Sequence, residues 1–348
     1  MAKRKPITAG VVGLGRIGWG RHLKELKKNK DFEITACVDA LGARRKEAKE
    51  VYGCQTFSNV NDFLKSGVAE LAIICTMSVD HCKHTLAALR TGHHVLVEKP
   101  MAMSVREADR MIAAAKKAKR VFTVHQSSRP AQAPRFVGEI IKSGILGKVF
   151  WIRHADHVFF RRNDWQTLKK NGGGTLNNWG AHTVDYCLLL MDSPVKDVWG
   201  ELKHTVTAGD ADDYMKVVIR GESHQVIEVE YSYACAFKPP AWIVAGTQGT
   251  MQIEGDTATI KYFDPKKAPR IKAVDGPVMS RGYGSDDRLP WKEKTLKVKA
   301  KKPYPDFYER LADSIRKGRK LLVTPESVRQ QIYVLDQVRK SSDWDWKK

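Results

Sequence analysis

The feature that most constrains the fold is the glycine-rich turn Gly13-Leu14-Gly15-Arg16-Ile17-Gly18, which joins an apolar run to a segment with helical spacing. Residues 7–125 repeat this order, because short runs of Val, Ile, Leu and Ala alternate with helix-like segments. Apolar runs without polar alternation are typical of parallel strands that helices cover on both faces. The pattern predicts an α/β protein whose first part is a doubly wound parallel sheet.

The glycine turn and one acidic residue predict a dinucleotide site. The first glycine of such a turn permits a tight bend, the second lets a pyrophosphate approach the backbone, and the third lets helix and strand pack closely. Asp39 ends the second apolar run, where a carboxylate accepts hydrogen bonds from the adenosine ribose and repels a 2′-phosphate. We therefore expect NAD as the cofactor and NADP less so, although Arg44 and Arg45 lie nearby in the sequence. The predicted cofactor residues of this motif are Gly13, Gly15, Arg16, Ile17, Gly18 and Asp39.

After about residue 125 the pattern changes. Residues 194–302 contain alternating strand-like runs separated by glycine and proline, which predicts a large, open and mostly antiparallel sheet. We expect two domains, residues 1–124 as the nucleotide-binding domain and residues 125–348 as an α+β domain for substrate binding and oligomerisation. Predicted helices lie at about 130–143, 305–317 and 326–340, and a predicted strand lies at 148–158. The last helix is introduced by Thr324 as its cap and Pro325 in its first turn.

Composition excludes several classes of protein. In 348 residues, 42% are hydrophobic and 9% aromatic, which is typical of globular chains. The apolar runs are too short for a membrane span, and the first residues lead into a predicted strand instead of a signal peptide. Six scattered cysteines without a CxxC pair indicate reduced thiols. We expect a soluble, cytoplasmic protein with no membrane partner.

The net charge of +21 has its densest part between residues 261 and 302, with 13 Lys and Arg against five Asp and Glu. Lys297, Lys299 and Lys301 alternate with apolar residues, which predicts that these lysines share one face of a strand. We interpret them as a solvated face that protects an edge strand, in preference to a polyanion site. A nucleic-acid partner is therefore not expected.

Two further clusters carry candidate chemistry. In Glu98-Lys99-Pro100 the proline keeps Lys99 extended at the carboxyl end of a predicted parallel strand, where open α/β sheets bind ligands. Asn178 and His182 follow the glycine run 172–174 and are four residues apart, so on a helix the amide could orient the imidazole. Histidine is the natural general base near neutral pH. No metal site is predicted, since His154 and His157 would lie on opposite faces of a strand.

With these motifs, the chain resembles the glucose-fructose oxidoreductase, inositol dehydrogenase and MocA (Gfo/Idh/MocA) family of NAD-dependent oxidoreductases. The resemblance covers nearly the whole chain and includes GLGRIG at 13–18, LVEKPMA at 96–102, the glycine run up to His182, and PDFYERLADSI at 305–315. It implies an N-terminal Rossmann domain and a second domain whose open sheet often joins copies, here as a homodimer or homotetramer. It also implies a sugar, sugar derivative or cyclitol as the substrate.

The resemblance further implies roles for single residues. Lys99 would contact the reacting hydroxyl and the nicotinamide ribose, and His182 would be the acid and base. Asn178, the third catalytic candidate, stands where many members carry aspartate, and an amide cannot stabilise an imidazolium by charge. Thr76, His81, Glu98, Lys99 and Trp165 would contact the cofactor. The substrate candidates are Lys99, Gln126, Arg129, Asp164, Trp165, Asn178 and His182, with Arg161 or Arg162 for an anionic group.

The expected reaction is oxidation of a secondary hydroxyl of a sugar, glycoside or cyclitol, with hydride transfer to nicotinamide and the proton passing to His182 or Lys99. Two alternatives stay open at this point. One is a redox-neutral glycosidase that uses the same cofactor, and the other is a non-enzymatic NAD-binding regulator. The presence of both Lys99 and His182 favours an enzyme.

Overall fold

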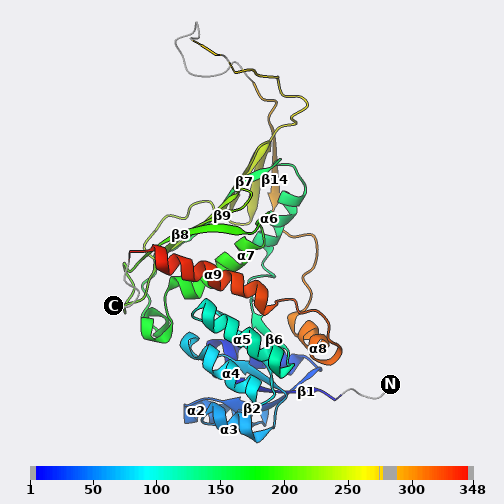
Figure 1. The fold of residues 1–348 in the computed structure, drawn as a ribbon, viewed down its shortest axis with the longest axis vertical. Helices are drawn as coiled ribbons and strands as arrows, with labels where there is room; N and C mark the ends of the chain where they lie inside the picture. The colour runs from blue at the N-terminus through cyan, green and yellow to red at the C-terminus, as the bar shows by residue number, and fades with distance from the viewer. Residues whose placement is uncertain (1–4, 274, 277–287, 344–348) are drawn as a thin grey trace.

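The computed structural model describes residues 5–273, 275–276 and 288–343. Two sheets, each covered by helices, follow one another along the chain (Figure 1). In the described ranges no helix combines the length and the apolar character that crossing a bilayer requires. All six cysteines are free thiols, as the sequence predicts.

The first sheet has six parallel strands in the order β3-β2-β1-β4-β5-β6, which confirms the predicted doubly wound α/β sheet. The strands are β1 (Ile7–Val12), β2 (Phe32–Val38), β3 (Gln55–Phe57), β4 (Leu71–Ile74), β5 (His94–Glu98) and β6 (Phe122–His125). The order reverses between β1 and β4. In open α/β sheets, ligands bind beyond the carboxyl ends of the strands at this switch point.

Helices bury apolar side chains against both faces of this sheet. One face carries α3 (Val60–Ser66), α4 (His81–Arg90), α5 (Val105–Ala118) and the start of α9 (Pro325–Ser341). The other face carries the π-helical turn η1 (Gly18–Leu23), α1 (Lys24–Lys28), α2 (Gly42–Tyr52) and α8 (Phe307–Lys317). Burial on both faces explains why the strands are continuous apolar runs.

The second sheet has eight strands in the order β14-β13-β12-β11-β7-β10-β9-β8 and is antiparallel except between β7 and β10, as predicted. The strands are β7 (Val149–His157), β8 (Val195–Lys203), β9 (Tyr214–Gly221), β10 (Val226–Ser232), β11 (Trp242–Gly246), β12 (Gly249–Glu254), β13 (Thr257–Tyr262) and β14 (Lys292–Lys297). The helices α6 (Gln132–Lys142), α7 (Ala181–Leu188) and the end of α9 pack against one face. The short helical turns are η2 (Ser78–Asp80), η3 (Trp165–Thr167), η4 (Lys169–Asn171) and η5 (Leu176–Gly180).

The prediction of one strand that carries Lys297, Lys299 and Lys301 is wrong beyond residue 297, where the strand ends. Lys297 pairs with Thr257, the first residue of β13, and after one more backbone hydrogen bond, from the Val298 N–H to the Asp256 oxygen at 2.8 Å, the pairing ends. The chain turns there towards α6, where the backbone N–H of Lys301 donates to the Glu139 carboxylate at 3.0 Å. Three charged residues of the basic segment, Arg281, Asp286 and Asp287, lie outside the described residues.

The last helix, α9, connects the sheets. Thr324 accepts a hydrogen bond from the Ser327 N–H and Pro325 stands in the first turn, so the predicted start of α9 is confirmed. Val328 and Ile332 of α9 pack in the core of the first sheet, whereas its later residues pack in the core of the second. One rigid helix thus positions the two sheets relative to each other. The domain division at 124/125 stays a prediction.

Candidate functional site

The glycine turn leaves an open cradle at the carboxyl end of β1. A Cβ atom on Gly13, whose φ is +94°, would lie 2.6 Å from the Cys75 carbonyl oxygen, and one on Gly18 would lie 1.9 Å from the Gly13 oxygen. Both positions therefore require glycine. Gly15 differs, because no other described atom beyond its chain neighbours lies within 4 Å of where its Cβ would stand. Arg16 and Ile17 beside it are exposed, so the turn offers backbone and free space to a pyrophosphate.

Asp39 lies beside this cradle at the end of β2. Its Oδ2 accepts from the Leu14 N–H at 2.9 Å and from Arg44 Nη1 at 3.2 Å, and its Oδ1 accepts from the Leu41 N–H at 2.9 Å. The carboxylate is thus anchored to the glycine turn, as a group that binds an adenosine ribose must be. These residues fit a dinucleotide.

Lys99 follows β5 at the predicted edge and connects the two halves of the chain. Its Nζ donates to both the backbone oxygen and the side-chain Oδ1 of Asn178, each at 2.8 Å. Burial lowers the pKa of Lys99 to about 8, the Glu98 carboxylate opposes this shift, and the Arg162 and Arg16 guanidinium groups add to it. With this pKa the amine is mostly protonated at neutral pH and loses its proton at mildly alkaline pH.

A buried hydrogen-bond network lies directly behind Lys99. Glu98 Oε1 accepts from His22 Nε2 at 2.8 Å and from His125 Nδ1 at 2.6 Å, and Tyr308 Oη lies 2.8 Å from His22 Nδ1. Burial alone would raise the pKa of Glu98, but the two imidazoles outweigh it and hold that pKa well below its usual range. Although the imidazole nitrogens and the carboxylate oxygen also form a group of possible metal ligands, their separations are hydrogen-bond lengths.

His182 lies in the first turn of α7, and its partner is not the predicted one. Its Nδ1 lies 3.1 Å from Ser128 Oγ, while the Asn178 amide is turned to Lys99. Asn178 belongs to the π-helical turn η5, whose wider winding removes the α-helical alignment of residues four apart. The prediction that Asn178 orients His182 is therefore wrong. Burial and the Lys99 charge lower the pKa of His182 well below its usual value, so the imidazole is neutral.

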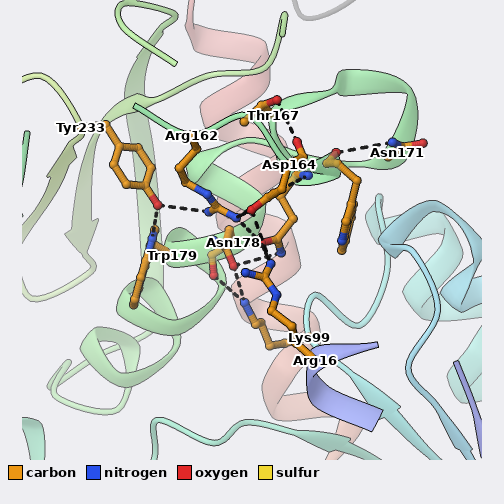
Figure 2. Close-up of polar contacts among 11 residues, drawn as sticks. Arg16, Lys99, Arg162, Asp164, Thr167, Asn171, Asn178, Trp179 and Tyr233 are labelled. Carbon is orange, nitrogen blue, oxygen red and sulfur yellow. Dashed lines mark hydrogen bonds and ion pairs between the residues drawn. The ribbon is translucent and has the colours of Figure 1, made fainter. Parts of the chain in front are cut away.

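The loop after β7 and the residue that follows β10 supply a polar wall opposite the glycine turn (Figure 2). Arg162 Nη2 lies 2.9 and 2.7 Å from the two carboxylate oxygens of Asp164 and 2.6 Å from Gln166 Oε1, and Arg162 Nη1 donates to Tyr233 Oη at 3.2 Å. Arg16 of the glycine turn donates to the same Gln166 oxygen at 3.0 Å. The wall and the glycine turn are thus in direct contact beside Lys99.

Two predicted cofactor residues, Thr76 and His81, lie at the end of β4 and the start of α4. Thr76 Oγ1 lies 3.1 Å from His84 Nδ1. His81 is buried, and its ring nitrogens lie 2.7 Å from the Pro100 oxygen and 3.0 Å from the Thr76 oxygen. The imidazole therefore fastens β4 to the loop that carries Lys99.

The other predicted site residues either lie away from the contact between Lys99 and Asn178 or make no side-chain contact with it. Gln126 is buried and donates to the Ala181 oxygen at 3.2 Å. Arg129 is buried in a two-pronged ion pair with Asp185, with both distances 2.8 Å. Trp165 is half-buried at the start of η3, and Arg161 is exposed. The structure thus gives Gln126 and Arg129 positions that support α7.

Sequence reasoning missed the network partners His22, His125 and Tyr308, the wall residues Gln166 and Tyr233, and Ser128 and Trp179 beside His182. One feature of the sequence could have pointed to His22. It is a polar residue next to Leu23 and near Leu26, in a helix that packs on the sheet. Tyr308 and Trp179 lie inside two sequence motifs, PDFYERLADSI at 305–315 and the glycine run up to His182, but had been given no role there. The remaining residues come from segments with no recognisable motif.

Comparisons with known proteins agree with this architecture. A family model described as the oxidoreductase family with an NAD-binding Rossmann fold matches residues 7–126, and the GFO/IDH/MocA C-terminal domain matches residues 135–252. The scyllo-inositol 2-dehydrogenase (NADP(+)) of Bacillus subtilis (strain 168) is 24% identical and aligns with 97% of this chain and 94% of its own length. The 2,7-anhydro-N-acetylneuraminate hydratase of Escherichia coli (strain K12) is 24% identical over 71% of this chain and 68% of its own length.

A solved structure of an NAD-binding protein from Listeria innocua superposes with a TM-score of 0.82, at 24% identity, over 97% of this chain and 95% of that one. At this identity the likeness shows the fold. The family assignment rests on the two family models, because together they span the glycine turn, Asp39, Lys99 and His182. The chain therefore belongs to the GFO/IDH/MocA family of oxidoreductases, and its first sheet is an NAD-binding Rossmann domain.

Proposed function

We propose that the chain is an NAD-dependent dehydrogenase that oxidises a secondary hydroxyl of a sugar, glycoside or cyclitol. The observation that carries this proposal is the Lys99 amine at the carboxyl end of β5, with a pKa of about 8 and in contact with the helical segment that carries His182. Relatives named for a cyclitol and for an anhydro sugar acid support a substrate of this class.

The site residues would divide the work as follows. The glycine turn and Asp39 hold the dinucleotide, which when bound supplies the hydride acceptor. Lys99 donates a hydrogen bond to the reacting hydroxyl and stabilises the negative charge that develops on its oxygen. His182 accepts the hydroxyl proton at Nε2 while Ser128 holds Nδ1. The C–H and O–H bonds of the substrate break, and its carbonyl forms.

A second candidate is a redox-neutral reaction on the same fold. One relative is named a hydratase and not a dehydrogenase, although it aligns with 71% of this chain. In that case the reduced cofactor would not accumulate. The presence of Lys99 and His182 suits either reaction, because both need a proton acceptor next to the oxidised carbon.

The test is NADH formation by purified protein supplied with NAD and a panel of sugars, uronic acids, glycosides and inositols. We expect His182→Ala to lower kcat by about 10²-fold or more while NAD binding is unchanged. His224→Asn is the matched control, since His224 lies in the turn between β9 and β10 with a φ of 67° that asparagine also adopts. Product formation without NADH would support the redox-neutral reaction. An active His182→Ala enzyme would contradict the assigned base.

We also propose that copies of the chain pair through the face of the second sheet opposite α6, α7 and α9. This face carries Trp199, Val218 and Ile243. Trp199 pairs with Val218, and it lies on the side of the sheet away from the core residues Val217 and Leu202. Trp199 is 49% exposed. A partly apolar sheet face of this kind suits an isologous dimer.

A further inference from the structure

We propose that Trp179 is the platform on which the ring of the substrate stacks, so that it selects cyclic over open-chain polyols. This inference rests on the proposed function and names the part of the substrate that the site recognises. Trp179 lies in η5 directly after Asn178, whose two oxygens hold the Lys99 amine, and three residues before His182.

One face of the Trp179 indole packs on a buried tyrosine, and the side chain is partly exposed. The ring stacks on Tyr231, with centroids 5.1 Å apart and an interplanar angle of 11°. Tyr231 is only 3% exposed, whereas Trp179 is 37% exposed. Because Tyr231 covers one face, the exposure of Trp179 falls on its opposite face and edge. Its place next to Asn178 and near His182, with a buried tyrosine behind it, makes this partly exposed ring a candidate surface for a ligand.

The indole is also held in one orientation. Its Nε1 donates to Tyr233 Oη at 2.6 Å, and the same oxygen accepts from Arg162, which is paired with Asp164 (Figure 2). Tyr233 is itself buried and packs edge-on against Tyr231. Substrate therefore meets a fixed aromatic surface and need not order a mobile one, which favours tight and selective binding.

The position of the indole relative to the reacting groups suits a six-membered polyol ring. Its centroid lies 6.4 Å from that of the His182 imidazole. The C–H groups on one side of a pyranose or inositol ring carry slight positive charge and match the negative face of an indole. Its hydroxyls point outward, towards Lys99, Asn178 and His182. An open-chain polyol presents no such flat surface.

The test compares wild type with Trp179→Phe and Trp179→Leu, each saturated with NAD. Binding of scyllo-inositol and methyl β-D-glucopyranoside as cyclic probes, and of D-glucitol as an open-chain probe, is measured by calorimetry, together with KM and kcat for whichever probes turn over. We expect Trp179→Leu to weaken binding of the cyclic probes about three- to tenfold through KM with kcat little changed. Trp179→Phe keeps an aromatic face and should stay near wild type. NAD affinity and melting temperature are recorded for each variant.

Trp291→Leu is the matched control, because Trp291 is similarly exposed at 48% and packs on Phe263 at the far end of the second sheet. Unchanged cyclic-probe binding in Trp179→Leu would overturn the platform while leaving the proposed function intact. Equal losses in the Phe and Leu variants would also overturn it, since they would trace the effect to the lost N–H group. If wild type binds none of the probes, the carbohydrate function fails and the platform fails with it.

Discussion

At the scale of single residues, Glu98 favours the protonated form of Lys99 against the effect of burial. The carboxylate is buried, ionised and next to the lysine, and it opposes the fall in the Lys99 pKa that burial causes. Glu98→Gln removes this charge, so the pKa of Lys99 should fall below about 8. If protonated Lys99 stabilises the developing oxyanion, the alkaline limb of kcat/KM then moves to lower pH and activity near pH 8 falls severalfold. A pH–rate profile measures this shift.

The exposed Glu222 offers a matched control for that substitution. Glu222→Gln makes the same chemical change away from the site and should leave the profile in place. An unmoved alkaline limb in Glu98→Gln, with folding intact, would show that Lys99 is not the group titrating there.

At the scale of elements, the buried Arg129–Asp185 pair holds α7, and with it His182, against the end of β6. Arg129 also donates to Ser327 of α9 at 3.0 Å, so three segments meet at one guanidinium. Arg129→Met leaves Asp185 buried without its partner and should cost about 3–5 kcal/mol of stability. Urea unfolding measures the loss, which the double variant with Asp185→Leu should largely restore.

The pH dependence of this loss has a definite sign. Burial raises the pKa of Asp185, and removing Arg129 raises it further, because the guanidinium favours the carboxylate form. When the pKa of a carboxyl group is higher in the folded than in the unfolded protein, its ionised form destabilises the fold at high pH. This destabilisation disappears as the pH falls and the carboxyl group becomes protonated. The deficit of Arg129→Met should therefore shrink as the pH is lowered from about 8 to about 5. A deficit that is independent of pH would point to lost packing instead of an unpaired charge.

At the scale of the whole molecule, the proposed pairing through the open face of the second sheet can be tested by substitution. A charged side chain placed in a partly apolar interface is costly to bury, so Val218→Arg should shift the assembly towards monomer. Light scattering coupled to size exclusion measures the mass. Val51→Arg, at an exposed apolar position on α2, should leave the mass unchanged. A monomeric wild type would contradict the proposed pairing.

Most of the fold was predictable because its determinants are local. The unbroken apolar runs and the cap at Thr324 act over a few residues, and Asp39 follows the glycine turn within one strand–helix–strand unit. The end of β14 could not be predicted in this way, because it depends on where its partner strand β13 begins. The π-helical turn η5 was also missed, and it decides that Asn178 meets Lys99 and not His182.

The sequence by itself determined the parallel sheet, the dinucleotide cradle and the candidate pair Lys99 and His182, because each depends on residue types at short spacing. Only the tertiary structure decided which groups surround that pair. Lys99 meets Asn178 from 79 residues away, and His22 meets Glu98 from 76 and Tyr308 from 286. Such contacts follow from how two sheets and a shared helix pack, and no local pattern in the chain encodes them.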